Sequence, residues 1–418
     1  MTQLDVHDAT ERYLANPVFR AARYEELVVD DNPYRRPVRP DDIGLVDFGT
    51  PLDRERFCQL SALMGHRMLL NIYDTRKLIL PTAPTEEKWR DFELFYDDAN
   101  RVLGDLIRPY LEAHLFGFVR AEAEERVHDD PARLYERLGE LADVRRAAAV
   151  VLDGLVSGSA NQASMTEMMA IQTVATSLNA RLQPAVALPA RGRLRELLSV
   201  PGKGEDIGRE VAESAGVKYE PHSYFQYYLP STLALMNYVN AAAQDPSRVF
   251  RLVGSVLAQQ GPDVLAAARE VVSEVSEVGG PFAVRELSRG LEEYAILLEL
   301  HDEDYRRQFT WIDAMPEYRD KAERLQKAIE EFRIPVDLDT FVESWEECST
   351  THVHDEDRLL IIESGEMEFW NCYGARHKYR PGDKAFIPKH RLHGSVVLTG
   401  ECVYHQPVIT PELDAQHG

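Results

Sequence analysis

The chain has little of what marks several common protein classes. It holds only four cysteines among 418 residues, and no two of them form a CxxC pair. This spacing favours reduced thiols over a disulfide framework or a thiolate zinc site. No apolar run is long enough to span a bilayer, and the first residues lack the basic and apolar segments of a signal peptide. We therefore expect a cytoplasmic protein that does not enter a membrane.

Positive charge is also scarce. The chain carries 47 lysine and arginine residues against 70 aspartate and glutamate residues, which gives a formal net charge of -23 at pH 7. Such a charge repels phosphate backbones and anionic lipid surfaces, so it argues against nucleic-acid and membrane-surface partners. A small-molecule substrate or a protein partner is favoured.

The distribution of helix and strand patterns indicates more than one domain. A chain of this length exceeds what one hydrophobic core usually serves. Residues 1–120 mix proline-bearing connections with amphipathic helical segments, and residues 121–331 are almost entirely helical in pattern. From residue 332 to 418, short apolar runs alternate with Ser-Gly, Pro-Gly and Thr-Gly pairs, which is typical of strands and turns. We predict a multidomain α + β fold with a helical N-terminal region, a helical bundle and a C-terminal β domain.

Three histidines in the C-terminal segment have metal-ligand spacing. His352 and His354 are two residues apart, which places both imidazoles on one face of a strand. His393 follows a turn and a short apolar strand, and an adjacent antiparallel strand can bring it beside the pair. Imidazole ligands suit Fe(II), Cu, Ni and Zn, and a facial set leaves positions for substrate and O₂. We predict one mononuclear metal site, with Fe(II) as first choice and Zn, Ni or Mn as alternatives.

This spacing resembles the cupin family. Its first motif is HxH followed by a glutamate and a glycine, and its second contains a glycine, a proline and a histidine. The matching positions are His352, His354, Gly365, Gly382, Pro388 and His393. The resemblance implies a β-barrel of jelly-roll type. It also implies a carboxylate ligand, but Arg358 occupies that position, so the metal set is expected to be three histidines alone.

Arg358 has two candidate roles. A metal held by neutral imidazoles keeps its full charge, which favours an anionic or chelating substrate. Arg358 lies four residues after His354, and its guanidinium can bind a carboxylate or a nitrogen–oxygen anion through two hydrogen bonds. The alternative is an ion pair with Asp355, Glu356 or Asp357. We predict Arg358 as a catalytic-site residue and keep the ion pair as the competing interpretation.

The run from 223 to 260 resembles the haem-oxygenase-like helical proteins, some of which hold a di-iron site. Those members carry an HxxxDxxH helix, whereas His301 is followed here by Tyr305 and Gln308 at the corresponding positions. We therefore expect the helical domain to lack a functional di-iron centre. His301 is then expected on an exposed helical face, and the domain is expected to act as a scaffold for dimerisation or substrate shaping.

The order of a helical region, a haem-oxygenase-like bundle and a three-histidine cupin resembles the N-nitrosating metalloenzymes of streptozotocin biosynthesis. In that family the helical domain hydroxylates guanidine nitrogens, and the cupin iron then drives rearrangement to an N-nitroso product. The resemblance implies a homodimeric Fe(II)- and O₂-dependent oxidoreductase of bacterial-type specialised metabolism. Its substrate would be a small N-hydroxylated amino acid or guanidine-like compound, with formation of an N–N bond or N-nitroso group.

Two other functions stay open from the sequence. One is a non-oxidative metal-dependent isomerase, lyase or hydrolase that uses the ion as a Lewis acid. The other is a ligand-binding accessory protein without catalytic activity.

Overall fold

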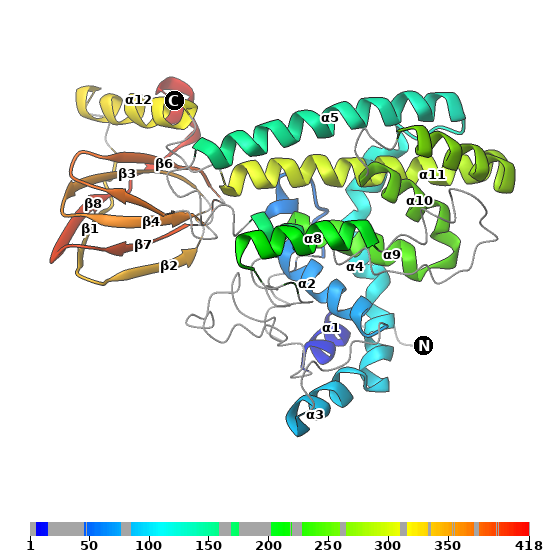
Figure 1. Ribbon diagram of the computed structural model, residues 1–418. Helices are drawn as coiled ribbons and strands as arrows, with labels where there is room; N and C mark the ends of the chain where they lie inside the picture. The colour runs from blue at the N-terminus through cyan, green and yellow to red at the C-terminus, as the bar shows by residue number, and fades with distance from the viewer. Residues whose placement is uncertain are drawn as a thin grey trace. The chain divides into compact units, whose positions relative to one another are not determined.

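A computed structural model describes most of the chain, namely residues 6–15, 46, 48–76, 85–158, 169–174, 202–217, 219, 228–259, 265–309, 316–332, 336–352, 354, 356–371, 376–389, 391 and 393–417. The chain divides into two compact units, the first formed by 1–150 and 170–302 and the second by 151–169 and 303–418. Helices build the first unit, and two antiparallel sheets dominate the second (Figure 1). The predicted α + β fold class is confirmed, whereas the three predicted domain boundaries, at 1–120, 121–331 and 332–418, stay predictions.

The first unit is a helical bundle around two buried helices, α2 (Leu60–Asp74) and α9 (Pro230–Gln244), which pack against each other. Nearly every side chain of these two helices is buried, as expected for helices that are surrounded by others. The remaining helices are α1 (Val6–Leu14), η4 (Arg56–Cys58), α3 (Glu86–Phe95), α4 (Asp98–Glu124), α5 (Pro131–Gly158), α8 (Gly202–Ala215), η7 (Pro246–Arg248), α10 (Val249–Gln259) and α11 (Leu265–Phe309). The last residues of α5 and α11 belong to the second unit.

Helices α10 and α11 cross with their backbones in contact. A Cβ atom built on Gly254 would lie 2.1 Å from the Leu287 carbonyl oxygen, and one on Gly290 would lie 2.1 Å from the Arg251 carbonyl oxygen. No side chain fits at either position. The two glycines therefore allow an approach that any larger residue would prevent.

His301 is not on an exposed helical face, so that prediction was wrong. Its side chain is half-buried, and its Nδ1 lies 2.9 Å from the Ser231 hydroxyl at the start of α9. Burial lowers the pKa of His301 to about 3, with a smaller contribution from the charge of Arg145. The residues around His301 in the sequence are polar, which suggests an exposed helix face. In the structure, α9 packs beside α11 and covers His301, and the sequence of α11 alone does not reveal this contact.

The second unit is a two-sheet β domain. One sheet has the order β1-β8-β3-β6, with β9 paired to β3, and the other has the order β2-β7-β4-β5; all pairs are antiparallel. The strands are β1 (Thr340–Ser344), β2 (Cys348–His352), β3 (Asp357–Ser364), β4 (Met367–Asn371), β5 (Arg376–Tyr379), β6 (Lys384–Ile387), β7 (His393–Val397), β8 (Glu401–His405) and β9 (Val408–Ile409). This order is that of a jelly roll, so the domain is cupin-like as predicted.

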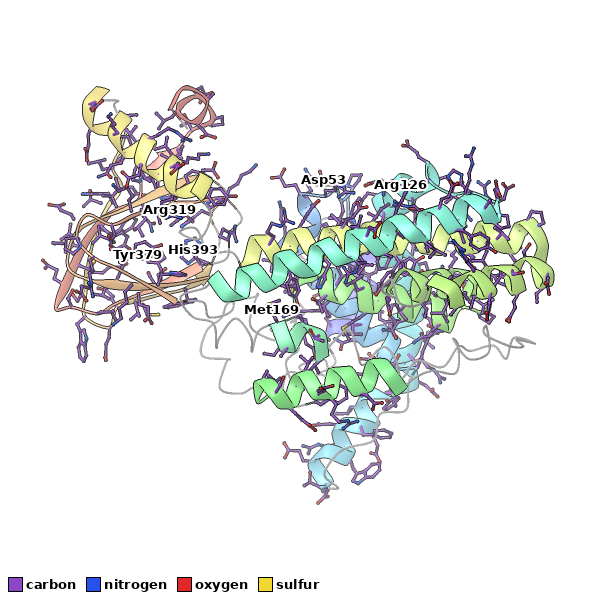
Figure 2. All side chains as sticks on the ribbon, turned by 45° about the horizontal axis from the view of Figure 1, so that its top comes forward. Asp53, Arg126, Met169, Arg319, Tyr379 and His393 are labelled. Atoms are coloured by element: carbon purple, nitrogen blue, oxygen red, sulfur yellow. The ribbon has the colours of Figure 1, made fainter. Side chains whose placement is uncertain are left out.

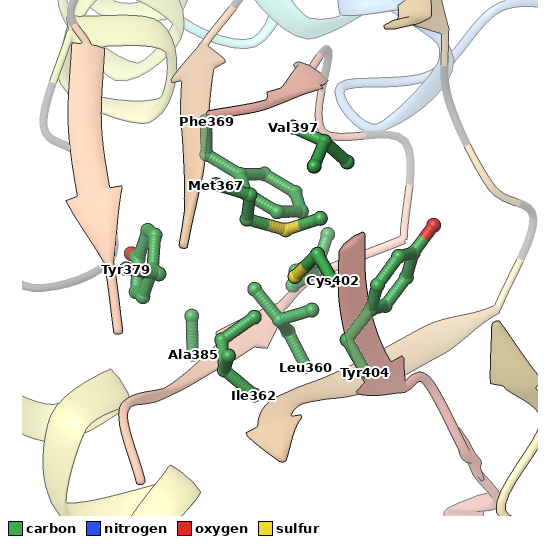
Figure 3. Packing of buried hydrophobic residues seen from close by; sticks show 10 residues of the cluster. Leu360, Ile362, Met367, Phe369, Tyr379, Ala385, Val397, Cys402 and Tyr404 are labelled. Atoms are coloured by element: carbon green, nitrogen blue, oxygen red, sulfur yellow. The ribbon is translucent and has the colours of Figure 1, made fainter. Parts of the chain in front are cut away.

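Two hydrophobic clusters flank β3. The interior of the sandwich is filled by Leu360, Ile362, Met367, Phe369, Tyr379, Ala385, Ile387, Val397, Cys402 and Tyr404 (Figure 3). On the outer face, Leu359 and Phe386 pack with residues of α12 (Pro316–Phe332) and α13 (Pro411–His417). Alternation along β3 thus sends Leu360 and Ile362 inward and Leu359 outward. Helix α12 covers β6 and β3 and is part of the β unit.

The motif glycines sit at turns that need them. Gly365 joins β3 to β4 with φ of 82°, and Gly382 joins β5 to β6 with φ of 89°. Both angles lie in the left-handed region that side-chain-bearing residues avoid. A Cβ on Gly365 would also lie 2.3 Å from the Glu401 carbonyl oxygen. The structure therefore explains why glycine occupies these two positions of the cupin-like pattern.

Cys402 is buried and carries a free thiol, while Cys372 lies outside the described residues. Among the residues that the structure describes, no helix is long and apolar enough to cross a membrane.

Candidate metal centre

The three predicted histidines converge at one end of the sheet that contains β2 and β7. His352 ends β2 and lies opposite His393, the first residue of β7, while His354 follows in the connection to β3. One nitrogen from each imidazole lies within 4.8 Å of the other two. Figure 2 shows His393 inside the β sandwich. The three side chains form a group that can hold a metal ion, and their individual roles as ligands stay a prediction.

The spacing of the imidazole nitrogens suits a shared ion. His352 Nε2 and His354 Nε2 are 3.2 Å apart. Two nitrogens that each lie about 2.1 Å from one ion, at an angle of about 100°, are separated by about 3.2 Å. The His393 ring centroid is 4.4 Å from that of His352 and 5.0 Å from that of His354. All three rings therefore surround one point.

His393 is held in the tautomer that a metal ligand needs. Its Nδ1–H donates to the Arg391 carbonyl oxygen at 2.7 Å, which leaves the lone pair on Nε2. That Nε2 atom is buried without a hydrogen-bond partner, in a side chain that is 1% exposed. Burial, followed by the charge of His352, lowers the pKa of His393 to about 3 and keeps the ring neutral. A buried acceptor without a partner is costly, and a bound metal ion would satisfy it.

Aromatic rings fix the strand that carries His393. The Phe369 ring stacks on His393 with centroids 6.3 Å apart and an interplanar angle of 16°. On the other face of the sheet, a Cβ atom on Gly394 would lie 2.6 Å from the Trp370 ring. The chain thus packs an aromatic ring on each side of β7 at the metal centre. The role of Gly394 is not apparent from the sequence, because no turn or motif marks it.

Arg358 has an ion-pair partner that is not apparent from the sequence. Its Nη1 lies 2.6 Å from Asp339 Oδ2 and 3.3 Å from the Gln406 carbonyl oxygen, and its Nη2 lies 3.7 Å from Glu356 Oε2. Glu356 was among the predicted partners, but Asp339 comes 19 residues earlier and no local spacing points to it. Of the other two candidates, Asp357 accepts from the Lys389 backbone N–H at 2.7 Å, and Asp355 lies outside the described residues.

Arg358 is nevertheless on the inner face of β3. It has the same parity as Leu360 and Ile362, which fill the sandwich interior, and its side chain is 16% exposed. The role of Arg358 toward a substrate stays a prediction.

The described parts of the chain hold one cluster of three or more His, Cys, Asp or Glu side chains whose ligand atoms are close enough to bind one metal ion. This cluster is the histidine trio. The expected absence of a di-iron centre also stays a prediction.

Comparison with known proteins finds one relative along most of the chain. No family model matches the chain. A curated relative, nitrosourea synthase of Streptomyces achromogenes subsp. streptozoticus, is 27% identical over 455 aligned residues, which cover 96% of this chain and 94% of that protein. Among solved structures, KdgF from Halomonas sp. matches 18% of this chain and 75% of its own at 21% identity, with a TM-score of 0.16. The chain therefore resembles nitrosourea synthase along nearly its whole length, with a cupin-like three-histidine centre in its C-terminal β domain.

Proposed function

We propose that this chain is a metal-dependent oxidase of natural-product biosynthesis that forms an N–N bond or an N-nitroso group. The observation that carries the proposal is the convergence of three imidazoles in a chain that aligns with nitrosourea synthase over 96% of its length. A nitrosourea contains an N-nitroso group, so the name of the relative supplies the reaction class. The proposed substrate is a small N-hydroxylated amino acid or guanidine-like compound, and no nucleic acid or membrane is involved.

Fe(II) is the proposed metal and O₂ the proposed oxidant. Three protein nitrogens leave open positions in a six-coordinate ion, and such facial sites hold substrate and O₂ side by side. When bound, Fe(II) supplies the one-electron chemistry with O₂ that side chains cannot. The protein contributes the geometry: the Arg391 carbonyl fixes the His393 tautomer, and Phe369 covers the ring face. Arg358 is proposed to bind the carboxylate of the substrate.

A second copy of the chain is the proposed partner. Val102, Leu106 and Tyr110 are spaced by four residues on α4 and are 56%, 44% and 53% exposed. This spacing places them on one helical face, and an apolar stripe of this kind is suited to isologous contact with its own copy. Sedimentation equilibrium would test this: a dimer for the unmodified chain and a monomer for Leu106→Glu are expected, and a monomeric unmodified chain contradicts the proposal.

Anaerobic reconstitution tests the proposed function. Metal-free protein is loaded with Fe(II) and supplied with Nω-hydroxy-L-arginine and related N-hydroxylated amino acids in an oxygen electrode. We expect about one iron per chain and substrate-dependent O₂ uptake, both lost in His352→Ala and His393→Ala. His405→Ala is the matched control, because His405 pairs with Glu363 at 3.1 Å and lies outside the trio. Full activity in His393→Ala contradicts the proposal.

The non-oxidative alternative has its own signature. Three neutral imidazoles also suit Zn, which acts as a Lewis acid without O₂. Turnover that persists under nitrogen with Zn in place of Fe(II) would support a lyase, isomerase or hydrolase instead.

A further inference from the structure

The strand that leads into the metal centre contains an irregularity. Ser349 of β2 lies opposite Ser395 of β7, and further along β2 His352 lies opposite His393. Ser349 and His352 are three residues apart, whereas Ser395 and His393 are two residues apart, so the register of the two strands shifts between these pairs. Strand β2 therefore has one extra residue here, which is a β-bulge.

The β-bulge changes which side chains share a face. In a regular strand, residues three apart point to opposite faces. The extra residue of β2 reverses this alternation, so Ser349 and His352 both lie on the face that Ser395 and His393 occupy. This face is the interior of the sandwich, because Phe369, opposite Ser395 on β4, belongs to the interior cluster. The β-bulge thus brings a serine hydroxyl beside a histidine of the metal centre.

The contact between Ser349 and His352 involves the ring nitrogen that faces away from the centre. The Ser349 hydroxyl lies 3.4 Å from His352 Nδ1, while His352 Nε2 lies 3.2 Å from His354 Nε2. An imidazole that binds a metal through Nε2 carries its proton on Nδ1, and that N–H needs an acceptor. A serine hydroxyl has two lone pairs and rotates to present one of them. Ser349 can therefore accept the proton of a metal-bound His352.

We propose that Ser349 is a positioning residue of the metal centre, whose hydroxyl accepts a hydrogen bond from His352 Nδ1–H and holds Nε2 toward the ion. The inference rests on the proposed metal-dependent function. His393 is oriented differently, because its Nδ1–H donates to the Arg391 carbonyl oxygen, which only accepts. A hydroxyl both donates and accepts, so Ser349 tolerates either tautomer of His352 before the metal binds and supports the ligating tautomer afterwards.

Ser395 offers a matched control. It lies directly opposite Ser349 on the same interior face, it is 3% exposed, and it carries the same hydroxyl group. In the part of the chain that the structure describes, no hydrogen bond joins Ser395 to the histidine trio. Loss of the Ser395 hydroxyl therefore changes the sandwich interior without removing a contact to a predicted ligand.

Co(II) binding tests the positioning role without turnover. The metal-free full-length chain is titrated with Co(II) in competition with a chromophoric chelator. We expect Ser349→Ala to weaken Co(II) binding about tenfold, the lower end of the range for partners of metal-bound histidines, because 3.4 Å is a long hydrogen bond. Ser349→Thr keeps the hydroxyl and should recover most of the loss. Ser395→Ala should stay within about twofold of the unmodified chain.

Proton NMR of the Co(II)-loaded chain gives a second readout. Each imidazole that binds Co(II) through Nε2 contributes one strongly shifted Nδ1–H signal that exchanges with water. In Ser349→Ala, one of these signals should exchange faster, because the N–H of His352 has lost its acceptor. The signal of His393 should keep its exchange rate, since its N–H donates to the Arg391 carbonyl oxygen. A general loosening of the fold would instead accelerate every signal.

Two results overturn the positioning role alone. One is that Ser349→Ala leaves both Co(II) affinity and N–H exchange unchanged. The other is that Ser349→Ala and Ser395→Ala weaken Co(II) binding equally, because the loss then follows from any missing interior hydroxyl. An unmodified chain that binds no Co(II) is a different result, since it contradicts the proposed metal-dependent function together with the positioning role.

Discussion

Replacing Arg358 with alanine separates its two candidate roles. If Arg358 binds a substrate carboxylate, the lost charge-assisted hydrogen bonds are worth about 1.5 to 3 kcal/mol. That corresponds to an increase in KM of about 10- to 150-fold. If Arg358 only pairs with Asp339, the effect is on stability. The two side chains are 16% and 44% exposed, and so accessible a pair contributes at most about 1 kcal/mol.

A matched pair of substrates makes the assay specific. O₂ uptake is measured with an N-hydroxylated amino acid and with its decarboxylated amine. We expect Arg358→Ala to raise KM for the amino acid alone, and Arg358→Lys to recover part of the loss, because an ammonium binds a carboxylate without the planar fork. Asp339→Asn leaves the guanidinium charge in place and removes its competitor, so KM for the amino acid should fall or stay unchanged.

The substrate-binding role of Arg358 is refuted if Arg358→Ala raises KM equally for both compounds, because the guanidinium would then act on the site as a whole. It is also refuted if Arg358→Ala and Asp339→Asn lower the melting temperature alike while KM stays constant. That result would establish the ion pair as the only role of Arg358.

Three further results are expected. Gly290→Ala should destabilise the helical unit by about 1 to 3 kcal/mol in urea unfolding, because its Cβ meets the backbone of α10, whereas Gly117→Ala, with open space, should stabilise by about 0.5 to 1 kcal/mol. Burial lowers the pKa of His66 to about 3, so the unfolded chain protonates first as pH falls below 6.5. With that pKa, lowering the pH from 8 to 5 should reduce the free energy of unfolding by about 2 kcal/mol. His66→Phe should make this reduction smaller. Fe(II) or Zn at 100 times its dissociation constant should add about 2.7 kcal/mol to stability, an increment that His393→Ala should abolish.

The histidine trio was predictable because its determinants are local or nearly so. The two-residue spacing of His352 and His354 reflects strand geometry, and Gly365 and Gly382 mark turns that demand a positive φ. His393 required one further step, the assumption that two strands are adjacent, and the β2–β7 register confirms it. The change from helix to strand patterns likewise predicted the fold class.

Features that depend on packing between distant segments were not predictable. Asp339 reaches Arg358 at the end of β8, which lies between β1 and β3: the Gln406 N–H donates to the Asp339 carbonyl oxygen, and the Gln406 carbonyl oxygen accepts from Arg358. His301 was misplaced for the same reason, since the partner that covers it, Ser231, is 70 residues away. Sequence periodicity identifies which face of a helix or strand is apolar. It does not identify which residues of other segments a polar side chain contacts.

The arginine in place of the cupin glutamate leaves the histidine trio without a carboxylate at that position. The three imidazoles carry no negative charge to offset a bound cation, and His393 stays neutral because of burial. Arg391, two residues away and 1% exposed, adds a buried positive charge that also lowers the pKa of His393. Arg358 has its charge balanced by Asp339, which lies 2.6 Å away. We therefore expect an anionic or chelating substrate to supply the negative charge that a bound metal ion needs.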